Sequence, residues 1–148
     1  MTREPQFSYL RGLVRAWASG EDRPVPPPGR LDREAFLRVF ACEAAAPALA
    51  GCLHRDAIPP GDWARCQKAL SITRQRTTWL LLELERILPA LTEAGCRPVV
   101  LKGPPLAVDL YPRPEDRWFV DLDVLLARDE LPAAYRALER VGYRFAET

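Results

Sequence analysis

Two aspartates near the end of the chain have the spacing of a metal-binding pair. Residues 121–126 read Asp-Leu-Asp-Val-Leu-Leu and predict a strand, on which Asp121 and Asp123 share one face. Like charges about 5 Å apart repel by roughly 3 kcal/mol at an effective dielectric of 20, and a divalent cation removes that cost. Two carboxylates suit Mg²⁺ or Mn²⁺, as in phosphoryl transfer. In the alternative, Asp121 caps the strand and Asp123 pairs with Arg117 or Arg128.

Lys102 and Gly103 stand where a strand is expected to end and a helix to begin. The backbone N–H groups and the dipole of a helix start favour an anion. Glycine lets a phosphate approach closely, and lysine adds a point charge. In the alternative, the pair forms a tight turn with a solvated lysine. Taken together with the aspartates, the pair indicates a site that handles phosphate.

The elements that position these residues form two regions. Residues 1–95 read as helices, the longest of which begins after Asp62 and carries a stripe of core residues, namely Leu80, Leu84, Ile87, Leu91 and Ala94. From residue 96 to residue 148 the pattern becomes strand, helix, strand, helix, strand, with strands expected at 98–101, 121–126 and 143–145. The sequence therefore predicts an α+β or α/β fold: a helical region followed by a small sheet, packed as one compact unit.

Composition excludes several classes of protein. The chain has 148 residues, 48% of them hydrophobic and 28% charged, which is typical of one globular domain. The 21 basic and 20 acidic residues nearly cancel, so nucleic acid is not indicated as a partner. No apolar run is long enough for a membrane helix, and no secretory signal is apparent, so we expect a cytoplasmic protein.

The cysteines and the single histidine are not expected to do chemistry. No C-x-x-C pair is present, which favours free thiols over a zinc site or a disulfide for Cys42, Cys52, Cys66 and Cys96. His54 stands alone before a Pro-Pro turn and is interpreted as a loop residue rather than a base or a ligand.

These motifs in this order resemble the uncharacterised bacterial nucleotidyltransferases of the polymerase-beta superfamily. The signature of that family runs from L-K-G through Y-P-x-P and an arginine to D-x-D. The matching residues are Leu101, Lys102, Gly103, Leu106, Tyr111, Pro112, Pro114, Arg117, Asp121, Asp123 and Leu125. The resemblance extends to the helices upstream and to the helix downstream, so the whole chain is similar to the first part of the family.

The resemblance implies an activity and a role for each residue. A nucleoside monophosphate would pass from a nucleoside triphosphate to an acceptor that the sequence does not identify. Asp121 and Asp123 would hold Mg²⁺ or Mn²⁺ and act as the catalytic pair, while Lys102 and Gly103 would lie against the nucleotide phosphates. Arg117 would orient a carboxylate or a phosphate.

The chain also departs from the family. Pro104 and Pro105 replace residues with free N–H groups, and Trp118 and Phe119 make the approach to the aspartates bulkier. The third carboxylate of the family is expected on a later strand, beyond Thr148. The alternative function is therefore a truncated or degenerate module that binds nucleotide or a partner without turnover. An incomplete sheet would also favour a homodimer or a complementary chain as partner.

Overall fold

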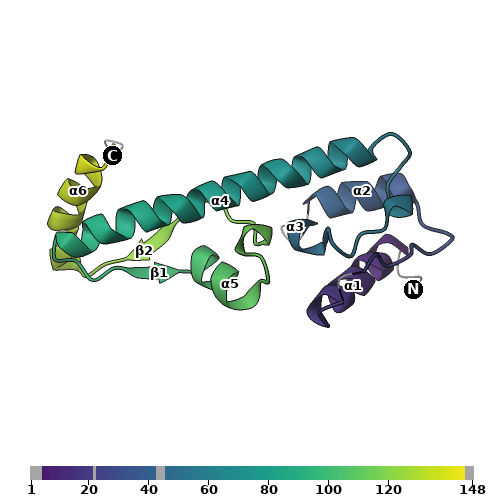
Figure 1. The fold of residues 1–148 in the computed structure, drawn as a ribbon, viewed down its shortest axis with the longest axis horizontal. Coiled ribbons are helices and arrows are strands. Elements are labelled where there is room, and N and C mark those ends of the chain that lie inside the picture. The colour runs from purple at the N-terminus through teal and green to yellow at the C-terminus, as the bar shows by residue number, and fades with distance from the viewer. Residues whose placement is uncertain (1–4, 22, 43–45, 146–148) are drawn as a thin grey trace.

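The computed structural model describes residues 5–21, 23–42 and 46–145, and one long helix, α4 (Trp63–Glu93), runs along it (Figure 1). Three shorter helices lie beside the first half of α4, and the strands lie beside its second half. Leu84, Ile87 and Leu91 are buried on one face of α4, as their helical spacing predicts. Helix α4 therefore joins the two halves of the molecule.

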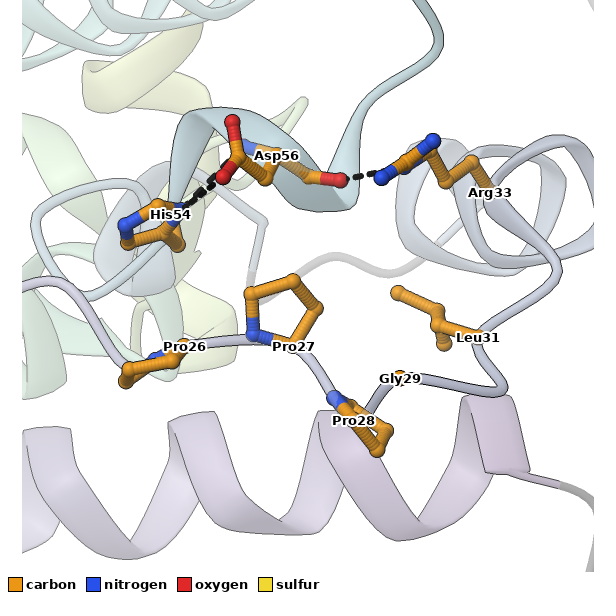
Figure 2. Close-up of a pocket in the computed structure, with 8 residues that line it drawn as sticks. All are labelled: Pro26, Pro27, Pro28, Gly29, Leu31, Arg33, His54 and Asp56. Carbon is orange, nitrogen blue, oxygen red and sulfur yellow. Dashed lines mark hydrogen bonds and ion pairs between the residues drawn. The ribbon is translucent and has the colours of Figure 1, made fainter.

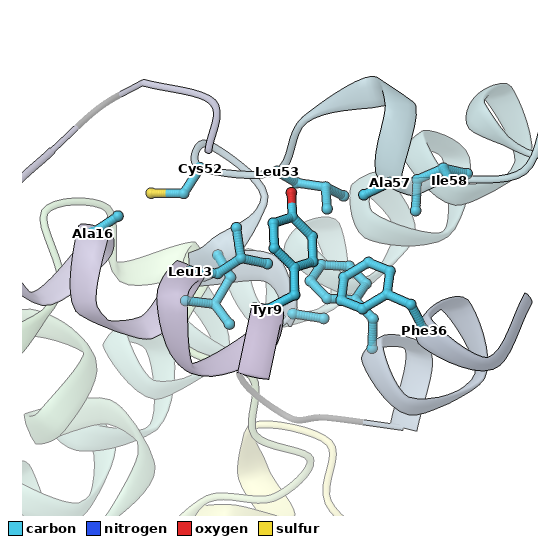
Figure 3. Close-up of a cluster of buried hydrophobic side chains, with 11 residues drawn as sticks. Tyr9, Leu13, Ala16, Phe36, Cys52, Leu53, Ala57 and Ile58 are labelled. Atoms are coloured by element: carbon cyan, nitrogen blue, oxygen red, sulfur yellow. The ribbon is translucent and has the colours of Figure 1, made fainter. Parts of the chain in front are cut away.

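The first half is a small helical core. It contains α1 (Pro5–Ala18), α2 (Arg33–Cys42), α3 (Ala46–Leu49) and the 3₁₀ turn η1 (Arg55–Ala57). Their buried side chains form one cluster, shown in Figure 3, that includes Tyr9, Leu13 and Phe36. The Tyr9 ring lies 5.0 Å from the Phe36 ring, and its hydroxyl donates a hydrogen bond to the Val25 carbonyl at 2.6 Å. This bond fixes the proline-rich connector against the core.

The second half holds the sheet. Strands β1 (Val99–Leu101) and β2 (Asp123–Leu125) pair antiparallel, with Leu101 opposite Asp123. Helix α5 (Gly103–Leu110) and the turn η2 (Pro114–Asp116) connect them, and η3 (Arg128–Glu130) leads into α6 (Leu131–Arg140). A second core cluster packs α6 on the end of α4 through Leu91, Cys96, Ala134 and Ala137. The α+β prediction is therefore confirmed.

The prediction of a third strand at residues 143–145 is wrong. Residues 143–145 form no strand, so the sheet in the described part of the chain has two strands. Their side chains instead find partners on helices. The Tyr143 hydroxyl donates to Glu83 Oε1 on α4 at 2.6 Å, and the Phe145 ring lies 4.3 Å from Tyr135 on α6. Hydrogen bonds from Arg86 and Tyr143 hold the pKa of Glu83 below its usual value.

A buried ion-pair network connects α3, α4 and η2. Asp116 is 5% exposed, and its two oxygens contact Arg74 Nε at 2.5 Å and Arg113 Nε at 2.9 Å. Arg74 also donates to the Pro47 carbonyl at 3.2 Å. A buried carboxylate is tolerated when its lone pairs are satisfied in this way. The network fixes the loop that leads toward Asp121.

We expect Asp116→Asn to lower the free energy of unfolding by about 3 kcal/mol, because Arg74 and Arg113 would both lose the carboxylate charge and one of them would face an amide NH2 group, which cannot accept a hydrogen bond. Urea unfolding followed by circular dichroism measures the change. Asp109→Asn is the control, since Asp109 is exposed on α5 and its loss should change stability by less than about 0.5 kcal/mol. Equal stability of the two variants would contradict the role given to Asp116.

Candidate functional site

Lys102 occupies a strained backbone position between β1 and α5. Its φ is 55° and its ψ is −98°, and within the described ranges it is the one residue other than glycine with positive φ. A side chain at such a position costs about 1 to 3 kcal/mol, and strain of this size concentrates at functional sites. Glycine at this position would relieve the strain.

The register of the sheet brings Lys102 to Asp123. Because Leu101 pairs with Asp123, the next residue along the chain lies within reach of the carboxylate, and Lys102 Nζ is 2.8 Å from Asp123 Oδ2. This hydrogen bond is the main cause that raises the pKa of Lys102, and the charge of Asp121 raises it further. The pair is open to solvent, with the Lys102 side chain 76% exposed.

The charge of Asp121 also acts on Lys102, so both predicted aspartates influence the same ammonium group. Strand β2 begins at Asp123, two residues later than predicted, which leaves Asp121 in the segment before the strand. Among residues 5–21, 23–42 and 46–145, no cluster of three or more His, Cys, Asp or Glu side chains has the arrangement of a metal-binding group. The predicted metal ligands are thus two carboxylates next to one lysine.

Gly103 has a packing role that the sequence does not reveal. A side-chain carbon at this position would lie 2.7 Å from Cγ of Phe119, closer than such atoms approach in real proteins. The buried Phe119 ring therefore fills the space that glycine leaves at the start of α5. Phe119 was predicted only to make the approach bulkier, whereas here it fixes the helix start beside Lys102.

The guanidinium group of Arg117 lies over the ring of Tyr111, the tyrosine of the Y-P-x-P motif. Its guanidinium carbon is 5.9 Å from the centre of the Tyr111 ring, and Tyr111 in turn lies 5.2 Å from Trp17 on α1. Neither Arg117 nor Arg128 forms an ion pair with Asp123 in the described part of the chain, so Lys102 takes the place of both partners that the sequence suggested. The structure thus brings together Lys102, Asp121 and Asp123 and stacks Arg117 on Tyr111.

The face of the sheet that carries Asp123 is otherwise apolar. Val99, Leu101 and Leu125 share this face by their register, and they are 53%, 37% and 57% exposed. The opposite face points Val124 toward the second core cluster. A bound molecule that reached Asp123 would therefore lie on apolar surface.

Three cavities lie outside this site. The one in Figure 2 has a volume of about 440 Å³ and is lined by Pro26, Pro27, Pro28, Gly29, Leu31, Arg33, His54 and Asp56. His54 Nδ1 accepts a hydrogen bond from the Asp56 backbone N–H at 3.2 Å, which places it as the cap of η1 and agrees with its interpretation as a loop residue. Neither Lys102 nor Asp121 nor Asp123 lines any of the three cavities.

Sequence reasoning missed Asp116 and Arg113. The spacing Arg113-x-x-Asp116 places both residues on one turn and was a usable signal. The partner from α4, Arg74, lies 42 positions earlier and gave no signal, because an ion pair at that separation depends on the tertiary fold.

The fold and the site together define a class: an α+β protein with a lysine and two aspartates beside the junction of a strand and a helix, an arrangement suited to phosphate chemistry. Residues 30–148 match the model of a family described as uncharacterised nucleotidyltransferase, and the chain belongs to that family. No curated protein and no solved structure matches the chain. No helix in the described ranges has the length and apolar character that crossing a membrane requires.

We expect Lys102→Gly to be more stable than Lys102→Ala by about 1 kcal/mol, because both lose the exposed ion pair but glycine alone relieves the positive φ. Paired thermal and urea unfolding of the two variants measures the difference. If alanine is tolerated as well as glycine, Lys102 is not strained in solution.

We expect Gly103→Ala to lower the free energy of unfolding by about 1 to 3 kcal/mol, because the new methyl group meets the Phe119 ring. Gly12→Ala is the matched control. Gly12 lies within α1 with no atom near a side-chain carbon there, so alanine should be neutral or stabilising. A Gly103→Ala variant that unfolds like the wild type would show that the helix start can shift away from Phe119.

Proposed function

We propose that the chain handles a nucleoside triphosphate as a polymerase-beta-like nucleotidyltransferase, with Mg²⁺ or Mn²⁺ and an acceptor still to be identified. Membership of a nucleotidyltransferase family supports the reaction class. The observation that carries the site assignment is the pair of Lys102 and Asp123, 2.8 Å apart at the start of a helix, with Asp121 acting on the same lysine. These are the charges that a triphosphate with its cation requires.

The donor set fits a hard cation. Asp121 and Asp123 offer only oxygen atoms, which Mg²⁺ and Mn²⁺ prefer, and both side chains are accessible rather than enclosed. When bound there, the cation would neutralise charge on the triphosphate and the leaving pyrophosphate. The two carboxylates would supply part of its ligands, and phosphate oxygens and water would supply the rest.

Lys102 has two alternative partners in this proposal. Without substrate its ammonium group neutralises Asp123. With substrate the ammonium group moves to a phosphate oxygen, which frees Asp123 for the cation. The flexible four-carbon stem of lysine allows this exchange, while the backbone at Lys102 stays fixed. Pro104 and Pro105 have no N–H, so the Gly103 N–H is the donor that the first residues of α5 offer to the same phosphate.

The proposed reaction is a substitution at the α phosphorus of the nucleoside triphosphate. An acceptor oxygen forms a bond to that phosphorus, and the bond to the oxygen that bridges to the β phosphorus breaks. Pyrophosphate leaves with the bonding electrons, and the acceptor proton passes to solvent. Asp121, Asp123 and Lys102 hold the triphosphate in place, and Arg117, stacked on Tyr111, orients a carboxylate or phosphate nearby.

A second function shares the same residues. The site as described contains two carboxylates and no third metal ligand among the described side chains, which favours a module that binds nucleotide with little or no turnover. Wild-type chain that transfers a nucleoside monophosphate at an enzymatic rate would exclude this alternative.

We expect Asp123→Asn to abolish Mg²⁺-dependent ATP binding while leaving the thermal melt unchanged, because the lost carboxylate is a ligand on an exposed surface and contributes little to packing. Calorimetric titration of ATP with Mg²⁺ into the wild type should show weak binding, in the millimolar range. Asp129→Asn removes the same charge from an exposed turn, η3, and should bind as the wild type does.

Two results would contradict the proposal. If Asp123→Asn and the wild type bind ATP with Mg²⁺ equally well, Asp121 and Asp123 do not form the metal site. If the wild type does not bind ATP at millimolar concentration, ATP is not a ligand of this chain. Leu91→Ala serves as a scaffold control, since truncation of a core leucine should cost about 2 to 5 kcal/mol in stability.

A further inference from the structure

A cavity of about 340 Å³ lies between the start of α4 and the loop that leads toward Asp121. Its wall includes Leu53 from the helical core, Trp63, Cys66, Leu70 and Arg74 from α4, and Arg113 from the loop after α5. The volume lies within the range of small-molecule sites, which are mostly apolar with a few polar groups that fix orientation. Both halves of the molecule contribute to this wall.

The charged end of the cavity carries an excess of positive charge. Arg74 and Arg113 share the single carboxylate of Asp116, so two positive charges face one negative charge. Each guanidinium has five N–H groups. Arg74 uses Nε for Asp116 and Nη2 for Pro47, and Arg113 directs Nε and Nη2 at one oxygen of Asp116. Both arginines line the cavity and have further N–H groups, which a second anion could use.

The rest of the wall combines apolar side chains with the polar Gln67 and Ser71. Trp63, Cys66 and Leu70 are partly buried and pack against the helical core cluster. Burial, with a smaller contribution from the charge of Asp62, raises the pKa of the Cys66 thiol. The thiol is therefore protonated near neutral pH and reacts slowly, and a molecule in the cavity would shield it further.

We propose that this cavity binds a small organic anion, with a carboxylate or phosphate group at Arg74 and Arg113 and an aromatic or apolar body against Trp63 and Leu70. The inference does not rest on the proposed nucleotidyl transfer, because the wall contains neither Lys102 nor the two aspartates. It assigns a second ligand site to the chain, separate from the nucleotide.

The test measures alkylation of Cys66 by iodoacetamide in the full chain, read by peptide mass spectrometry. Phenyl phosphate or benzoate at millimolar concentration should slow the reaction at least threefold, and the comparison of the two shows which anionic group fits. Benzyl alcohol, which lacks the charge, and inorganic phosphate, which lacks the ring, should leave the rate unchanged. Equal protection by benzyl alcohol, or no protection by either aromatic anion, overturns the proposal.

Variants test the charged end of the cavity. Arg113→Gln should remove the protection, since it deletes the excess positive charge and leaves Arg74 to pair with Asp116. Arg76→Gln is the matched control, because Arg76 is exposed on α4 outside the cavity and its loss should preserve protection. Ser71→Glu, which adds a carboxylate to the cavity wall, should abolish protection independently. Protection that survives both Arg113→Gln and Ser71→Glu overturns the proposal.

One further measurement distinguishes binding in the cavity from binding at the nucleotide site. Asp123→Asn should retain protection of Cys66 by phenyl phosphate, whatever its effect on ATP binding. Loss of that protection in Asp123→Asn would mean that the anion occupies the nucleotide site, and the assignment of a second site would be wrong.

Discussion

Asp116 carries a negative charge inside the protein, and a buried charge requires partners that only the correct assembly of the chain provides. Arg74 reaches it from the long helix α4, and Arg113 reaches it from the same turn. Because Arg74 also bonds the carbonyl of Pro47, the ion pair joins the helical half to the loop that ends at the candidate site. Movement of this loop relative to α4 would break the contact with Arg74 and leave the buried carboxylate with Arg113 as its one arginine partner, so α4 helps to fix the residues that precede Asp121.

The chain passes from this fixed loop into β2. The register of β2 with β1 then determines where Lys102 and Asp123 lie relative to each other. Leu101 opposite Asp123 places Lys102 next to the carboxylate, and a slip of one residue would turn Asp123 to the other face of the sheet. The Phe119 ring against Gly103 fixes the start of α5 at the same point. The strained backbone of Lys102 thus lies between strand β1 and a helix start that packs against Phe119.

The sequence predicted the features that depend on local pattern. Helical spacing in α4, the run at residues 99–101 and the pair of Lys102 and Gly103 at a strand end all reflect neighbours in the chain. The sequence did not predict features that depend on distant residues: the contact of Arg74 with Asp116, the ring of Phe119 against Gly103, and the choice of Lys102 over Arg117 as the partner of Asp123. The prediction of a third strand was wrong for the same reason. Tyr143 and Phe145 are residue types common in strands, but here they contact Glu83 and Tyr135 on helices.

The pairing of Lys102 with Asp123 also bears on how such a site avoids electrostatic strain without substrate. Two nearby carboxylates repel, and the ammonium group of Lys102, which pairs with Asp123, supplies a compensating charge that the proposed cation would replace. Both members of the pair are accessible, so separating them costs little in water. A deeply buried pair would be expensive to break and would exclude the cation. In the proposed function, the solvent exposure of Lys102 and Asp123 would therefore let the pair separate at little cost when a triphosphate binds beside the apolar face of the sheet.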